Sequence, residues 1–67
     1  MTNSIKVERA KRGMTQQDLA AKLNVSRQTI IAIEAGKFNP STVLALKISE
    51  LFDLPVNDIF HLEERDR

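Results

Sequence analysis

The sequence predicts an all-α domain built from five short helices. Apolar residues recur three or four positions apart in five successive segments, which is the spacing of helices that each bury one face. Residues that cap helix N-termini precede most of these segments, and Gly, Asn or Pro follow them. Because 67 residues allow one small core, we expect a single domain over residues 1–67, with the core at about residues 5–60.

The first helix is expected near residues 6–12, where Gly13 supplies the stop. Its expected inward contacts are Val7, Ala10 and Met14.

The second helix is expected over residues 16–23. Thr15 can cap it, and Asp18 follows three positions later, as in a capping box. Asn24 stands where the helix should end, and Asn tolerates the left-handed backbone of such an end. The residues expected to face inward are Leu19, Ala20 and Leu23.

The third helix is expected over residues 27–35, with Ser26 as its cap and Gly36 after its end. Ile30 and Ile33 form its inward stripe.

A loop follows up to Pro40, and its Phe38 is expected to pack against the core. The fourth helix is expected over residues 41–52, starting at Ser41. Its expected core face consists of Leu44, Ala45, Ile48, Leu51 and Phe52.

The fifth helix is expected over residues 56–60, after Pro55. Residues 59–62 are apolar and partly β-prone, so a short strand there that pairs with residues 2–5 is one expectation. For the charged residues 63–67 we favour a frayed tail.

The segments TQQDLA, NVSRQTI and IEAGKFNPS place two helices on either side of a three- to four-residue turn, which is typical of a DNA-reading helix-turn-helix. They resemble the Cro/CI-type repressors, also called the xenobiotic-response-element (XRE) family, over about residues 5–60. The resemblance is closest to small standalone regulators such as the cytolysin repressor. It implies a lambda-repressor-like five-helix domain that binds duplex DNA.

Base-reading side chains are expected at the N-terminal end of the third helix, because that end enters the major groove. They are Ser26, Arg27, Gln28 and Thr29, with Ile31 and Ala32 one turn later. Gln28 can pair with adenine and Arg27 with guanine, although a phosphate contact is the alternative for Arg27. Decoration of a solvated helix face is the competing interpretation.

Phosphate contacts are expected from Gln16 and Gln17, at the positive end of the second helix, and from Lys37 and Asn39 after the third. The alternative for Asn39 is a role in the turn before Pro40. The resemblance also implies a structural ion pair between Arg9 and Glu34.

The charge distribution favours nucleic acid weakly. Residues 1–37 carry seven basic and three acidic side chains, whereas residues 38–67 carry three basic and six acidic ones. A mixed solvated surface is the competing explanation.

Catalysis finds no support, and neither a metal, a cofactor nor a small-molecule ligand is expected. The single histidine, His61, has no metal-ligand spacing around it, and there is no glycine-rich phosphate loop. The absence of cysteine suits a cytoplasmic protein, and no apolar run is long enough for a membrane span.

Surplus apolar residues in the fourth helix and in the segment after it predict a homodimer. The expected interface consists of Leu51, Leu54, Pro55, Val56 and Leu62, and closure of the monomer core is the competing role. Two subunits would then read a palindromic operator whose half-sites lie about 34 Å apart. We expect a transcriptional regulator, and specifically a repressor. The alternatives are an antitoxin, a restriction-system controller or, from another class, a protein-interaction module.

Overall fold

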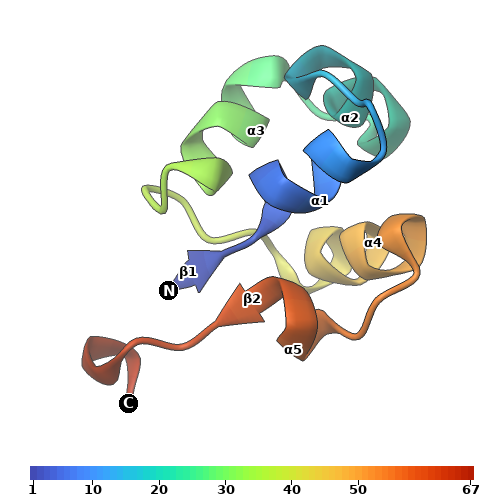
Figure 1. Ribbon diagram of the computed structural model, residues 1–67. Helices are drawn as coiled ribbons and strands as arrows, with labels where there is room; N and C mark the ends of the chain where they lie inside the picture. The colour runs from blue at the N-terminus through green and yellow to red at the C-terminus, as the bar shows by residue number, and fades with distance from the viewer.

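The computed structural model describes residues 1–67 and contains five helices, as the sequence predicts (Figure 1). Each helix begins and ends within one residue of its expected bounds. None is both long enough and apolar enough to cross a membrane. In chain order the elements are β1 (Thr2–Asn3), α1 (Ile5–Lys11), α2 (Gln16–Leu23), α3 (Arg27–Glu34), α4 (Thr42–Phe52), α5 (Val56–Ile59), β2 (Phe60–His61) and a 3₁₀ turn, η1 (Glu64–Asp66).

The expected N-caps are confirmed at the starts of α2, α3 and α4. The Asp18 amide donates to Thr15 Oγ1 at 3.0 Å and the Thr15 amide donates to Asp18 Oδ2 at 2.9 Å, which completes a capping box. Ser26 and Ser41 accept from the amides of Thr29 and Leu44, both at 3.1 Å. These bonds satisfy amides that a helix leaves free at its start, and they fix where each helix begins.

A residue with left-handed backbone follows each of α1 to α4, and Gly13 supplies the expected stop after α1 with a φ of 65°. Asn24 has a φ of 57° after α2, as expected, and Gly36 has a φ of 74° just beyond α3. Asp53 adopts the same conformation after α4, with a φ of 55°. The sequence did not point to Asp53, because Asp is also a common residue in ordinary turns.

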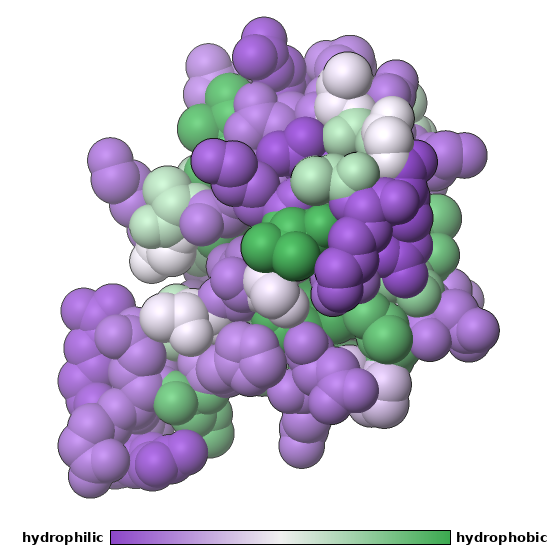
Figure 2. Space-filling view, in the orientation of Figure 1, coloured by the Kyte–Doolittle hydropathy of each residue, from purple (hydrophilic) through white to green (hydrophobic).

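The core lies among the five helices and β2. Its eleven buried residues are Ile5, Leu19, Ala20, Leu23, Ile30, Ile33, Leu44, Ile48, Phe52, Ile59 and Phe60. The inward faces expected for α2 and α3 are therefore confirmed, and Ala45 and Leu51 of α4 are only half-buried. On the face shown in Figure 2, hydrophobic residues reach the surface in small patches among hydrophilic ones.

The inward face expected for α1 is wrong. Val7 is 54% exposed and Ala10 is also exposed, whereas Ile5 is fully buried. The helix begins at Ile5, and residues four apart share a helix face, so the inward face carries Ile5 and Arg9. Met14, just after the helix, packs partly buried against the core as expected.

The expectation that Phe38 packs against the core is also wrong, since this side chain is 51% exposed. The Lys37 amide bonds back to the Ala32 carbonyl at 3.0 Å around left-handed Gly36. Because α3 closes in this way, the following loop runs over the surface, and Phe38 lies outside the core.

The two chain ends meet in a short antiparallel sheet, so the expected strand pair is confirmed. Thr2 lies opposite His61 and Asn3 opposite Phe60, and the Ser4 amide extends the pairing to the Ile59 carbonyl at 2.9 Å.

The expectation of a frayed tail is wrong, because η1 is held at both ends. The Glu63 amide donates to Asp66 Oδ2 at 2.8 Å, and the Met1 ammonium lies 2.8 Å from both carboxylates. Hydrogen bonds from that ammonium are the first cause that lowers the pKa of Glu63 and of Asp66. Once the strand pair brings the two ends together, the charged residues have a local partner.

Candidate functional site

Helices α2 and α3 form a helix-turn-helix at one end of the molecule, with α5 and β2 at the other (Figure 1). The turn is fixed by Asn24 and by the Val25 amide, which donates to the Ala20 carbonyl at 3.0 Å. Val25 is partly buried against the core, so the turn is anchored to the helices it joins. The N-terminus of α3 is consequently held in a defined position on the surface.

The first turn of α3 presents two long polar side chains to solvent. Arg27 and Gln28 are exposed, and neither side chain has a hydrogen-bond partner within the chain. The hydroxyls of Ser26 and Thr29 lie 2.9 Å apart and take part in the cap. They are therefore less free to reach outward than the two longer side chains.

One turn later, the exposed side of α3 is partly apolar. Ile31 is 37% exposed and Ala32 is half-buried, while the neighbouring Ile30 and Ile33 fill the core. An isoleucine on this face gives a surface suited to an apolar partner such as a thymine methyl group.

A surface hollow lies in front of the N-terminus of α2. Its lining includes Gln16 and Gln17 from α2, Arg9 from α1 and Arg27 from α3. The hollow thus gathers two glutamine side chains and two guanidinium-bearing residues at the end of a helix where backbone amides and the dipole favour an anion. Arg27 lies beside residues expected to bind phosphate, which favours the phosphate alternative for this side chain.

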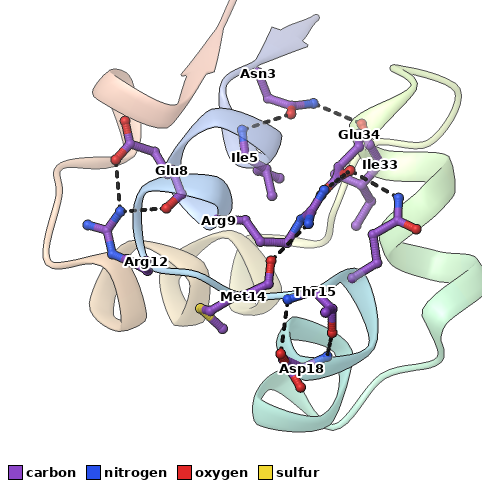
Figure 3. Close-up of polar contacts among 11 residues, drawn as sticks. Asn3, Ile5, Glu8, Arg9, Arg12, Met14, Thr15, Asp18, Ile33 and Glu34 are labelled. Atoms are coloured by element: carbon purple, nitrogen blue, oxygen red, sulfur yellow. Dashed lines mark hydrogen bonds and ion pairs between the residues drawn. The ribbon is translucent and has the colours of Figure 1, made fainter.

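Arg9 and Glu34 make a two-point ion pair between α1 and α3 (Figure 3). Arg9 Nε lies 2.9 Å from Glu34 Oε2, and Arg9 Nη2 lies 3.2 Å from Glu34 Oε1. The third donor, Arg9 Nη1, reaches the Met14 carbonyl at 2.9 Å. The side chains are only 13% and 7% exposed, so each charge depends on the other for compensation.

Gln16 joins this pair, a contact that the sequence did not predict. Its Nε2 donates to Glu34 Oε1 at 3.2 Å, so the carboxylate holds side chains from α1 and α2 together. Sequence spacing gives no signal for a contact across three helices, because it depends on how the helices pack.

Gln17, Lys37 and Asn39 are exposed, and their side chains make no hydrogen bond within the chain. The alternative role of Asn39 in the turn before Pro40 therefore lacks a supporting contact. Phe38, which was expected in the core, lies exposed between Lys37 and Asn39.

The residues expected at a dimer interface fall into two groups. Leu51, Leu54 and Val56 are partly buried against the core, whereas Pro55 and Leu62 are exposed.

The outer face of α4 carries two further exposed residues, Val43 at 63% and Leu46 at 52%. Beside Leu46 runs a mostly apolar groove between α4 and α5, and its remaining lining is Met1, Pro40, Thr42, Ala45, Val56 and Phe60.

Comparison with known proteins gives a consistent result. A family model described as helix-turn-helix matches residues 5–59. An uncharacterized HTH-type transcriptional regulator of Methanocaldococcus jannaschii is 55% identical over 64 residues, which cover 96% of this chain and 97% of the relative. A Bacillus subtilis protein with the same description is 44% identical over 66 residues, covering 98% of this chain and 100% of the relative.

Proposed function

Because this chain belongs to the Cro/CI-type helix-turn-helix family of DNA-binding transcriptional regulators, we propose that it reads duplex DNA with α3 and represses transcription as a homodimer. The observation that carries the reading role is the first turn of α3, where Gln28 and Arg27 project free of any intramolecular partner.

Gln28 is the principal base reader in this proposal. Its amide carries both a donor and an acceptor, which match the N7 and N6 groups of adenine in the major groove. Ile31 then lies within the groove against a thymine methyl, and Ala32 allows the close approach of the helix. Ser26 and Thr29 fix the N-terminus of α3 and reach the DNA only at its edge, because their hydroxyls serve the cap.

The phosphate contacts flank this reader on two sides. Gln16, Gln17 and Arg27 bind one phosphate at the hollow in front of α2, where helix amides add their own attraction. Lys37 and Asn39 bind a second phosphate beyond the end of α3. Both of these side chains are exposed and without internal partners.

The proposed dimer forms through the outer face of α4 and α5. Leu46 and Val56 border the apolar groove there, and Leu62 is exposed after β2. In Figure 1, α5 and β2 lie at the end of the molecule opposite α2 and α3, so a two-fold contact at that end leaves both recognition helices free to face one side of the duplex. Burial of these side chains also adds apolar area that a 67-residue domain needs.

Repression follows from occupancy of an operator, which blocks polymerase without any further activity. A toxin-linked antitoxin or a restriction-system controller would use the same DNA-binding residues, so these functions remain alternatives within DNA binding. A protein-interaction module is the alternative from another class.

Titration of the protein with a labelled random duplex separates these classes. We expect binding at low salt that weakens steeply as salt rises, because phosphate contacts release counterions. A protein-interaction module would show no salt-dependent binding to DNA. A variant with Arg27 and Lys37 both changed to Ala serves as the matched control and should bind random duplex more weakly.

Sedimentation equilibrium tests the dimer. Leu46→Glu places a charge beside the groove and should shift the protein toward monomer. Val7→Glu is the control, because Val7 is similarly exposed on α1, away from the groove. A wild-type protein that stays monomeric at tens of micromolar while it binds its operator at full affinity would refute the dimer.

A further inference from the structure

We propose that Glu34 is a positioning residue for DNA binding, because it holds the Gln16 side-chain amide in the orientation that meets a DNA phosphate. This inference rests on the proposed function and extends the role of the Arg9–Glu34 pair beyond stabilising the fold. The observation behind it is the shared oxygen: Glu34 Oε1 accepts from Arg9 Nη2 and from Gln16 Nε2, both at 3.2 Å.

A carboxylate is the right group for this task. A glutamine amide has two donor hydrogens on nitrogen and an oxygen that only accepts, so its two orientations differ at the phosphate. An ionised carboxylate accepts only and therefore selects the nitrogen. One N–H of Gln16 then bonds Glu34, and the second N–H remains available to an anion at the hollow that Gln16 lines.

The ion pair also removes an electrostatic obstacle. An unpaired carboxylate this close to the hollow would repel a phosphate. Arg9 bonds both oxygens of Glu34 and compensates its charge, so the anion meets a neutral pair. Arg9 and Glu34 are largely buried, so the packing around them holds the carboxylate in place.

Pre-orientation improves affinity because less side-chain entropy is lost when the phosphate binds. Gln17 provides the internal comparison, since it lies in the same turn of α2 and lines the same hollow. Its side chain makes no bond to Glu34 or to any other residue. Glu34 should therefore affect the contribution of Gln16 and leave that of Gln17 unchanged.

A double-mutant cycle in DNA affinity tests this coupling. In the wild-type background, Gln16→Ala should weaken binding to a duplex by about three- to tenfold, the worth of one hydrogen bond. In a Glu34→Ala background the same change should weaken binding by less than about twofold, because the amide is no longer oriented. Gln17→Ala should cost the same factor in both backgrounds.

Stability is controlled separately. All variants are compared at a temperature where circular dichroism shows them fully folded. If Glu34→Ala does not fold, the cycle is repeated in Arg9→Met/Glu34→Met, which replaces the buried charges together. Equal losses for Gln16→Ala in both backgrounds would overturn the inference and leave Glu34 as a structural residue.

A second readout does not require DNA. Side-chain NMR relaxation of the Gln16 amide should show an ordered NH₂ group in wild type and a mobile one in Glu34→Ala. A mobile amide in wild type would overturn the inference even if DNA binding is intact. If wild type binds no duplex at low salt, the proposed function fails, and an ordered amide would then identify the contact as purely structural.

Discussion

Removal of the Arg9 guanidinium should destabilise the domain more than any other single loss of charge. Arg9→Ala deletes three hydrogen bonds, two to Glu34 and one to the Met14 carbonyl. Glu34, only 7% exposed, then keeps a single donor from Gln16. A nearly buried carboxylate is thereby left without its counter-ion.

The size of the effect follows from this geometry. Breaking a buried pair by removing one partner costs about 3–5 kcal/mol. We expect about 3 kcal/mol here, because Gln16 still supports the carboxylate and the adjacent hollow admits water. At about 4–8 °C per kcal/mol for a domain of this size, the melting temperature should fall by roughly 12–24 °C.

Thermal melts of a full cycle provide the assay. Glu34→Ala should lower the melting temperature less than Arg9→Ala does, because Arg9 keeps its hydrogen bond to the Met14 carbonyl and lines the hollow. The double mutant should lose less than the sum of both single losses. Lys11→Ala is the control, because its bond to Glu8 lies on the exposed surface and should contribute little to the free energy of unfolding. Strictly additive losses for Arg9 and Glu34 would show that the two side chains do not depend on each other.

Three further changes have defined outcomes. Ile5→Ala should lower the free energy of unfolding, measured by urea denaturation, by about 2–5 kcal/mol, because Ile5 is fully buried. Val7→Ala, on the exposed side of α1, should change it by no more than about 0.5 kcal/mol. Equal losses would contradict the corrected inward face of α1. Lys37→Ala should weaken binding to all duplexes alike and reduce the salt slope by about one unit; a loss confined to one sequence would exclude a phosphate role. The Thr15 amide holds the pKa of Asp18 below its ordinary 3.8, so the stability that Asp18 adds is present above that value and is lost as pH falls through the lowered pKa; Asp18→Asn should therefore flatten the decline in stability below about pH 4, and an unchanged decline would refute this contribution.

Much of the fold was predictable because local chemistry determines it. Thr15, Ser26 and Ser41 cap helices in the structure as their sequence positions indicate, and Asn24 takes the left-handed turn. These signals lie within four residues of the element they control, so a single sequence contains them. The helical spacing of apolar residues likewise identified the inward faces of α2 and α3.

The errors arose where contacts between distant parts of the chain determine which residues are buried or ordered. The Arg9–Glu34 ion pair that the family resemblance implied is confirmed, but apolar spacing within seven residues did not show that Ile5, and not Val7, shares the inward face with Arg9. The ordered tail depends on Met1 reaching Glu63 and Asp66, residues at the other end of the chain. At the candidate site, the sequence identified the exposed polar residues Gln28 and Lys37, but the contact of Gln16 with Glu34 required the packed structure.

In the proposed function, α3 reads base edges through Gln28. The most direct measurement begins with selection of a preferred site from random duplexes, followed by affinity measurements on that site and on a scrambled one. Gln28→Ala should lose about 1–3 kcal/mol on the selected site and almost nothing on the scrambled duplex. An equal loss on both sequences, or no preferred site at all, would contradict base reading by α3.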